Sequence, residues 1–284
     1  MTGEPQLEFV VGGVDFGEGP RWHDGRLWYS DFYQRSIYTV TEDGHRETAY
    51  SDLPDQTSGL GWLPDGRLLA VSMANKALLR DDGAGFVVHA DLSDMAGGYC
   101  NDMVVDHYGN AYVGNFGYDL FGGEQHRPAD LILVREDGST AIVAEGLKFP
   151  NGSVITPDNK TLIVGESYGA GYEAFTINRD GTLTDRRRWA DVPGMAPDGC
   201  TMDAKHGIWF ADARGSQLVR VLEGGEITHR IPTPQPVFAC ALGGEFGEQL
   251  FALCAPGSHP DEVRGKAGGA IYKIWVDVPH AGWP

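Results

Sequence analysis

Six positions spread along the chain carry side chains that could act together on a ligand. Each opens a similar apolar segment, and four of the six offer a carboxylate or amide oxygen. The six residues are Glu18, Ser58, Asn101, Asn151, Asp198 and Phe238. Two carboxylates and two amides at one point would repel one another or lie unsatisfied without a cation. A water-filled polar channel is the alternative to a metal site at these positions.

The donor types at these positions indicate which ion could bind. The set has oxygen donors and no His or Cys, which favours a hard divalent cation over zinc or copper. We therefore expect one divalent ion, with calcium preferred and magnesium, manganese or zinc as alternatives. The candidate ligands are Glu18, Asn101, Asn151 and Asp198.

The segments that must position these residues form a sixfold repeat. Units open as EGPRWHDGRLWYSDF at Glu18 and SGLGWLPDGRLLAVSM at Ser58, and successive openings are 40, 43, 50, 47 and 40 residues apart by subtraction of their positions. Each unit reads as about four short strands separated by Gly-rich turns, which is typical of propeller blades. The sequence predicts an all-β fold, a six-bladed β-propeller with four antiparallel strands per blade. We find no domain boundary, so residues 1–284 are expected to form one propeller.

Closure of the ring and the place of the site follow from this fold. The sixth unit has only three clear strands, so we expect the segment Gln6–Val11 to supply its outer strand and to remove an open sheet edge. The first strand of each blade lines the central channel, which brings the six opening residues to one height. The ends of the second strands return to the same mouth and should form a wider ring, where some side chains would carry a second ion or hydrogen-bond the inner residues. For Asp31 and Asp212 the alternative is that they stabilise turns. The outer ring would contain Asp31, Ser72, Asn115, Glu166, Asp212 and Cys254.

Composition restricts the partners of the protein. The chain has 22 basic and 40 acidic residues, a net charge of −18, and such a field repels nucleic acids and anionic membranes. The four cysteines show no metal-binding spacing. The N-terminus lacks a signal-peptide pattern, and no apolar run is long enough to span a membrane. These features predict a cytoplasmic protein, a monomer or small homo-oligomer, that acts on a small molecule.

The phrases that open the repeats together resemble one family. EGPRW at Glu18, ND at Asn101, PNGSVITPDNKTLIVGES around Asn151 and PDGCTMDAKHGIWFAD around Asp198 are similar to the SMP-30/gluconolactonase/regucalcin family, in the same order and over nearly the whole chain. The resemblance implies a six-bladed propeller that hydrolyses lactones with a divalent metal. It implies that Glu18, Asn151 and Asp198 hold the metal, that Asp198 is also the base, and that Asn101 binds substrate. The chain departs from the family at Tyr99, where sugar lactonases tend to carry arginine.

A metal-assisted hydrolysis is the expected reaction. The ion would polarise the ester carbonyl while Asp198 orients or deprotonates the attacking water. The chain has no G-x-S-x-G motif, and His23, His107 and His206 fall near turns away from the mouth, so we reject a serine hydrolase. Two other functions stay open: a non-catalytic propeller that binds calcium or a small ligand as a regulator, and a metal-dependent isomerase or cyclase.

The expected substrate-binding residues are largely aromatic. Besides Asn101 they include residues of the channel and of the long segment 116–130, which with segment 255–269 should rise at the mouth as a lid or wall. The remaining substrate-binding residues are Tyr99, Ser58, Phe238, Phe116 and Tyr118. An aromatic wall stabilises bound apolar groups and leaves sugar hydroxyls without hydrogen-bond partners. We therefore expect an aromatic or alkyl lactone to be preferred over gluconolactone.

Overall fold

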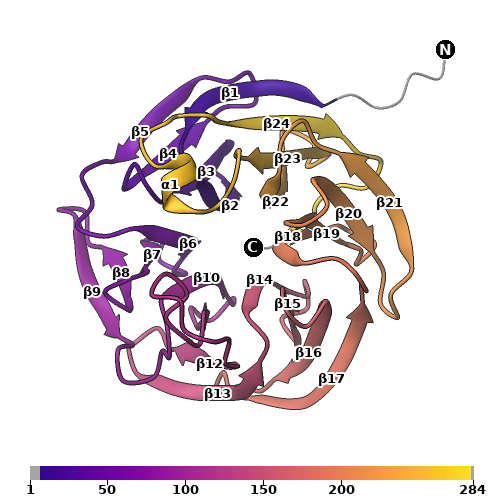
Figure 1. The fold of residues 1–284 in the computed structure, drawn as a ribbon. Coiled ribbons are helices and arrows are strands. Elements are labelled where there is room, and N and C mark those ends of the chain that lie inside the picture. The colour runs from indigo at the N-terminus through magenta and orange to yellow at the C-terminus, as the bar shows by residue number, and fades with distance from the viewer. Residues whose placement is uncertain (1–6, 283–284) are drawn as a thin grey trace.

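The computed structural model describes residues 7–282, which form six four-stranded antiparallel sheets arranged in a ring around a central channel (Figure 1). Blade one contains β2 (Gly17–His23), β3 (Arg26–Asp31), β4 (Ser36–Val40) and β5 (Arg46–Tyr50). Blade two contains β6 (Thr57–Trp62), β7 (Leu68–Ser72), β8 (Ala77–Asp81) and β9 (Phe86–Asp91). Blade three contains β10 (Cys100–Val105), β11 (Ala111–Asn115), β12 (Ala129–Val134) and β13 (Thr140–Leu147).

The second half of the ring repeats this order. Blade four contains β14 (Pro150–Ile155), β15 (Thr161–Glu166), β16 (Gly171–Ile177) and β17 (Leu183–Asp191). Blade five contains β18 (Pro197–Met202), β19 (Ile208–Asp212), β20 (Gln217–Val221) and β21 (Ile227–Pro232). Blade six contains β22 (Val237–Gly243), β23 (Gln249–Cys254), β24 (Gly269–Trp275) and β1 (Glu8–Val14). The prediction of a six-bladed propeller is confirmed.

The N-terminal strand closes the ring as predicted. In blade six the strands follow the order β1-β24-β23-β22, and β1 pairs antiparallel with β24 from Glu8 opposite Lys273 to Val14 opposite Gly269. The strand therefore runs three residues beyond the predicted end at Val11, because β24 continues to offer partners. Gln6, the predicted first residue of this strand, lies outside the described residues. The first and last strands of the chain, β1 and β24, are thus paired in one sheet.

The hydrophobic core lies between neighbouring blades. The innermost strands are almost wholly buried, as in β10 and β14, because each packs against two neighbours around the channel. The outermost strands, such as β17, are mostly exposed. One interblade cluster joins Val154 of blade four to Phe210 of blade five, and all four cysteines are buried with free thiols. This packing explains why apolar residues recur in every blade.

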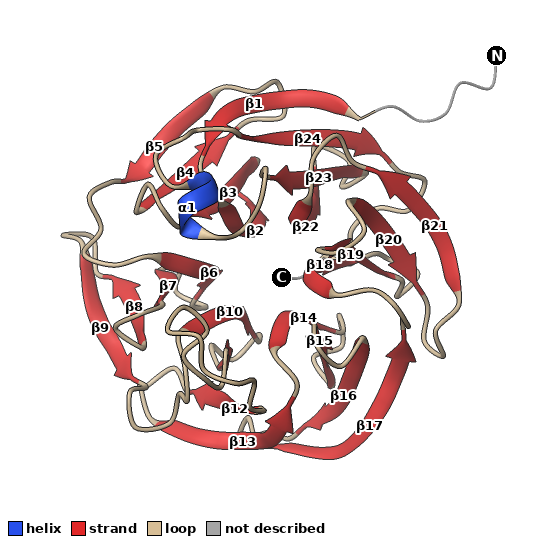
Figure 2. Cartoon of the chain, in the orientation of Figure 1, coloured by secondary structure: helices blue, strands red, loops and turns tan. Residues whose placement is uncertain are grey.

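Regular structure other than strand is sparse (Figure 2). Within the described residues the one α-helix is α1 (Pro260–Val263), which begins after His259 as N-cap. It lies inside the segment 255–269, for which the sequence predicted only a loop. Between residues 7 and 282 no helix is long and apolar enough to cross a membrane.

Candidate active site at the mouth of the central channel

The six opening residues occupy one register. Each is the second residue of the innermost strand of its blade: β2, β6, β10, β14, β18 and β22 in turn. In all six strands the pairing with the next strand is irregular near this residue. Such bulges redirect side chains and are common at active sites. The sixfold spacing in sequence thus corresponds to a ring of side chains at one end of the channel.

The glycine that follows several of these residues has a packing role. A Cβ on Gly152 would lie 2.4 Å from the carbonyl oxygen of Asp198, and a Cβ on Gly199 would lie 2.7 Å from the Cβ of Ala239. Both distances are too short for any side chain. Glycine therefore lets adjacent inner strands approach closely, which brings Asn151 and Asp198 together.

A cavity of about 380 Å³ opens at this mouth. It brings together Glu18, Asn101, Asn151, Asp198 and Phe238 of the predicted ring. Its other lining residues are Phe16, Phe32, Tyr33, Phe116, Leu120, Phe121, Phe149, Ser167, Tyr168, Ala196, Ala213, Arg214, Ser258 and His259. Ser58 is fully buried, with its Oγ 3.5 Å from Asn101 Oδ1, so it lies against the cavity wall.

The two carboxyl groups of the ring lie in an environment that disfavours their charge. Glu18 and Asp198 are only 5% and 9% exposed. Burial raises the pKa of Glu18 well above its ordinary value, and the charges of Asp198 and Asp102 raise it further. Burial also raises the pKa of Asp198 to about 8, with Asp102 adding to the effect and a hydrogen bond from Asn151 opposing it. Desolvation and like charge both disfavour the doubly ionised pair, so a bound proton or a cation would stabilise it.

Sequence reasoning missed a buried ion pair beneath the ring. Asp102, next to Asn101, accepts a hydrogen bond from Arg21 Nη2 at 3.1 Å, and both side chains are nearly inaccessible. Arg21 also donates to the backbone carbonyl of Pro20 at 2.8 Å. Because Arg21 is already neutralised by Asp102, it cannot fully compensate Glu18 and Asp198. The Asn-Asp dipeptide was visible in the sequence, but its partner from blade one was not.

Asn151 is held by neighbours on two strands. Its Nδ2 donates to Ser167 Oγ at 3.2 Å, and Ser167 Oγ donates to the carbonyl of Pro197 at 2.6 Å. The backbone carbonyl of Asn151 accepts a hydrogen bond from Ser153 Oγ at 3.0 Å. Sequence reasoning did not identify Ser167, which follows Glu166 at the end of β15.

Aromatic side chains form one wall of the cavity. Phe116, Phe149 and Phe238 line it and are 6%, 8% and 7% exposed. Phe116 stacks on Phe149 with ring centroids 4.8 Å apart, and this cluster is separate from the interblade core. Phe16 and Phe32, which sequence reasoning did not single out, belong to the same cluster. The expected aromatic wall therefore borders the cavity rather than the space between blades.

Two predicted substrate-binding residues lie behind this wall. Tyr99 stacks on Phe116 and packs on Phe121, with centroids 6.3 and 5.5 Å apart, and is not among the residues that line the cavity. Tyr118 is 3% exposed and packs edge-on against Phe149. Both residues support the wall from behind in this conformation.

Both long segments reach the mouth. Segment 116–130 contributes Phe116, Leu120 and Phe121 to the lining, and segment 255–269 contributes Ser258 and His259. Segment 255–269 is anchored by Asp15, whose carboxylate accepts hydrogen bonds from the backbone of Gly265 and Ala267 at 2.6 and 2.7 Å. These contacts place parts of both segments at the cavity entrance.

The expected outer ring mainly stabilises backbone. Asp31 accepts hydrogen bonds from the N–H groups of Asp15 and Phe16, and Asp212 accepts from those of Ala196 and Arg214. Glu166 accepts from the N–H of Lys148 at 2.7 Å. The turn-stabilising role considered for Asp31 and Asp212 therefore accounts for the contacts of these two residues.

The side chains of the predicted ring that could bind a cation offer oxygen atoms. Across residues 7–282 no three His, Cys, Asp or Glu side chains come together in a way that could hold a metal ion. The mouth offers two carboxylates, from Glu18 and Asp198, and the amides of Asn101 and Asn151. A cation at this place would depend on amide oxygens as well as on carboxylates.

The fold and the site together define a class of protein. It is a six-bladed propeller with two buried carboxyl groups and two amides at one mouth of its channel. The profile of the SMP-30/Gluconolactonase/LRE-like region matches residues 16–255, and the chain belongs to this family. It is 27% identical over 281 residues to an L-arabinolactonase of Azospirillum brasilense, covering 94% of this chain and 86% of the relative. It is 22% identical to a 6-deoxy-6-sulfogluconolactonase of Pseudomonas putida, covering 94% of both.

Solved structures share the fold closely. Regucalcin from Agrobacterium tumefaciens strain C58, described as a calcium-binding protein, has a TM-score of 0.81 at 20% identity. The superposition covers 99% of this chain and 97% of regucalcin. At this identity the likeness concerns the arrangement of the blades.

Proposed function

We propose that this protein is a divalent-metal-dependent lactone hydrolase, and that the mouth of the channel is its active site. The observation that carries the proposal is the buried pair Glu18 and Asp198, which share one cavity with Asn101 and Asn151. The lactonase names of its relatives support the reaction class. The calcium-binding regucalcin, with the same fold, supports a cation.

The residues present fit a hard divalent cation. Two carboxyl groups whose pKa values are raised by burial and by negative charge would be stabilised by an ion between them. Glu18, Asn151 and Asp198 would hold the ion through oxygen, with calcium the expected choice. When bound, such an ion supplies Lewis-acid polarisation of an ester carbonyl.

The protein's own residues would carry the remaining steps. Asp198 would orient the attacking water and accept its proton. Asn101 would donate an amide hydrogen bond to the substrate. The aromatic wall would exclude bulk water and strengthen these polar contacts. The ring-opened product would leave as a hydroxy acid.

The same wall supports an apolar substrate. Phe116, Phe121, Phe149 and Phe238 offer mostly carbon surface, which is worth about 25 cal/mol per Å² buried. Sugar hydroxyls would meet few partners there. We infer that aromatic or alkyl lactones are better substrates than gluconolactone.

Hydrolysis of three lactones tests the proposal. Chelated protein supplied in turn with Ca²⁺, Mg²⁺, Mn²⁺ or Zn²⁺ should hydrolyse dihydrocoumarin and an alkyl γ-lactone with a higher kcat/KM than gluconolactone. Absence of turnover with all four ions, despite ion binding, would favour the regulatory alternative. A gluconolactone kcat/KM ten times above both others would contradict the apolar preference alone.

Phe121→Ala provides a finer test of the wall. Phe121 lines the cavity and is 40% exposed, so its removal should lower kcat/KM for dihydrocoumarin by about fivefold, as expected for about 1 kcal/mol of lost apolar contact. Activity on gluconolactone should change less. Phe246→Ala is the matched control, because Phe246 is 66% exposed and lies outside the cavity lining, in the turn between β22 and β23. Equal losses on both substrates would show that Phe121 does not select between them.

A further inference from the structure

We propose that Ser167 is a positioning residue that orients the side-chain amide of Asn151 and ties it to the segment carrying Asp198. The inference rests on the proposed function, because it concerns how the chain presents an oxygen ligand to a divalent ion. Ser167 is 6% exposed and follows Glu166 at the end of β15, so its hydroxyl lies among buried groups of blades four and five.

The direction of two hydrogen bonds determines the orientation of the amide. A serine hydroxyl has one hydrogen, and Ser167 Oγ donates it to the carbonyl of Pro197 at 2.6 Å. Toward Asn151 the hydroxyl can therefore only accept, and it does so from Nδ2 at 3.2 Å. The nitrogen of the amide must face Ser167, so the oxygen, Oδ1, is turned away from it.

The same hydroxyl joins two blades at the site. Asn151 belongs to β14 of blade four, and Pro197 directly precedes Asp198 in β18 of blade five. One buried group thus contacts both strands that carry expected ligands. Fixing the spacing of two ligands in advance lowers the conformational entropy lost on binding, which is why groups behind metal ligands influence affinity.

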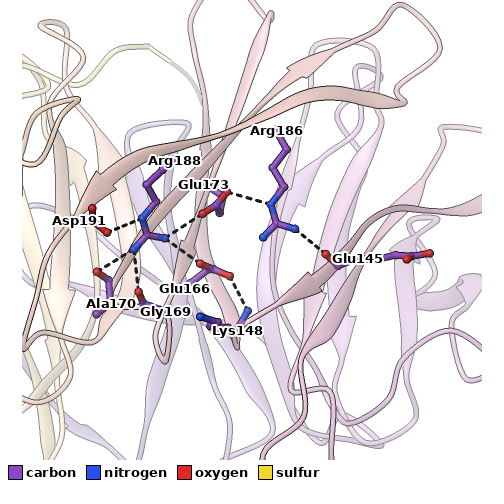
Figure 3. Close-up of polar contacts among 9 residues, drawn as sticks. All are labelled: Glu145, Lys148, Glu166, Gly169, Ala170, Glu173, Arg186, Arg188 and Asp191. Atoms are coloured by element: carbon purple, nitrogen blue, oxygen red, sulfur yellow. Dashed lines mark hydrogen bonds and ion pairs between the residues drawn. The ribbon is translucent and has the colours of Figure 1, made fainter.

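A network of ion pairs and hydrogen bonds holds residues on both sides of Ser167, among them Glu166 and Gly169 (Figure 3). Glu166 accepts a hydrogen bond from the Lys148 N–H at 2.7 Å and pairs with Arg188 at 3.0 Å. Arg188 Nη2 also donates to the carbonyls of Gly169 and Ala170, at 2.9 and 3.2 Å. Both sides of Ser167 are therefore tied to neighbouring strands, so its hydroxyl has little freedom to move.

The segment before Asn151 is clamped by the same turn. The Ser167 N–H donates to the carbonyl of Phe149 at 3.1 Å, and the Tyr168 N–H donates to that of Lys148 at 3.2 Å. Phe149 has φ = 62°, a left-handed conformation that bulky residues rarely adopt without such support. Phe149 and Asn151 thus reach the cavity from a segment held by β15 and its turn.

Metal affinity in two backgrounds tests the proposal. Isothermal titration of the chelated protein with Ca²⁺ and with Mn²⁺ should show about 10–100-fold weaker binding in Ser167→Ala, the range seen when groups behind ligands are removed. In an Asn151→Asp background both terminal atoms are oxygen, so orientation no longer matters. There Ser167→Ala should change affinity less than about threefold, well below that range.

Matched variants separate orientation from folding. Ser153→Ala removes another buried hydroxyl that contacts Asn151, but at its backbone carbonyl, so it should leave metal affinity unchanged. Ser167→Cys keeps the shape and weakens both hydrogen bonds, so it should lower affinity in the same direction if Ser167→Ala does not fold. Thermal unfolding in chelator confirms that each variant compared is folded.

Each outcome has a distinct meaning. Equal losses in both backgrounds, or no loss from Ser167→Ala and Ser167→Cys, would overturn the role of Ser167 while leaving a metal-dependent lactonase intact. Failure of the unsubstituted protein to bind either ion would overturn both this inference and the metal dependence of the proposed function. A loss confined to the Asn151 background supports the inference.

Discussion

The two ends of strand β18 place a buried aspartate in opposite electrostatic environments. Asp198 lies at the mouth, near Glu18 and under the influence of Asp102, and burial and like charge raise its pKa. Asp203 directly follows the strand at the other end, where Arg220 Nη2 donates to it at 3.0 Å and the backbone of Lys205 donates at 2.9 Å. Both side chains are buried, but only Asp203 has a full set of partners.

The difference separates structural groups from candidate functional groups. A buried carboxylate that serves the fold is neutralised by a cation and by N–H donors. A buried carboxylate that takes part in chemistry lacks such partners and can exchange a proton or bind an ion. Sequence alone shows two aspartates five residues apart in one strand region, and their environments assign them different roles.

The largest expected effect is on stability at the structural end. Arg220→Met should lower the free energy of unfolding by about 3–5 kcal/mol, because it leaves the buried Asp203 carboxylate without its cation. Urea unfolding in chelator measures this change. Arg230→Met, on the exposed face of β21, is the control and should change stability by no more than about 0.5 kcal/mol. A loss below about 1 kcal/mol in Arg220→Met would mean that the Asp203 pair is not structurally important.

The next effect is on activity at the mouth. Asp198→Asn is nearly isosteric and should retain the fold but lower lactone turnover by about two orders of magnitude or more, the usual contribution of an acid–base group. Unlike the change at Arg220, it should not lower the stability of chelated protein, since it removes one of two repelling carboxylates. Turnover of dihydrocoumarin and urea unfolding measure the two quantities.

A control on the same strand sharpens this result. Cys200 is buried two residues beyond Asp198, and Cys200→Ser should keep measurable activity when compared at equal folded fraction. If Asp198→Asn keeps activity within about threefold of the parent, far less than an acid–base group contributes, Asp198 is neither base nor essential ligand.

The smallest effect is the pH dependence of stability. The raised pKa values of Glu18 and Asp198 mean that the folded, metal-free protein holds protons more tightly than the unfolded chain. Their stabilising contribution is therefore fully present below pH 4 and is lost as pH rises through about 8, the folded-state pKa of Asp198. In chelator, the Tm of the parent protein should fall by a few degrees between pH 5 and pH 8.5, relative to the change in Tm of Asp198→Asn over the same range.

Addition of Ca²⁺ at pH 8.5 should recover this loss, because the ion replaces the departing protons. No recovery is expected in Asp198→Asn. A parent protein whose Tm rises between pH 5 and pH 8.5 relative to Asp198→Asn would show that the two carboxyl groups are not a strained pair.

The sequence by itself determined the number of blades, the closing strand and the height of the ring. A repeat of 40–50 residues with four strands has few ways to bury its apolar faces, so the ring follows from periodicity. Because inner strands enter the channel in one phase, equivalent positions meet, and Glu18, Asn151 and Asp198 share a cavity with Asn101 and Phe238. Local pattern is sufficient here because neighbouring blades impose the same register.

Only the tertiary structure decided which groups support or surround that ring. Arg21 reaches Asp102 across 81 residues, and Ser167 joins Asn151 to Pro197 of the next blade. It likewise put Tyr99 behind the aromatic wall and introduced Phe16, Phe32 and His259 at the cavity. Periodicity fixes the phase of a strand, but the contacts of side chains from turns and adjoining blades depend on the three-dimensional path of the chain, which no repeat in the sequence records.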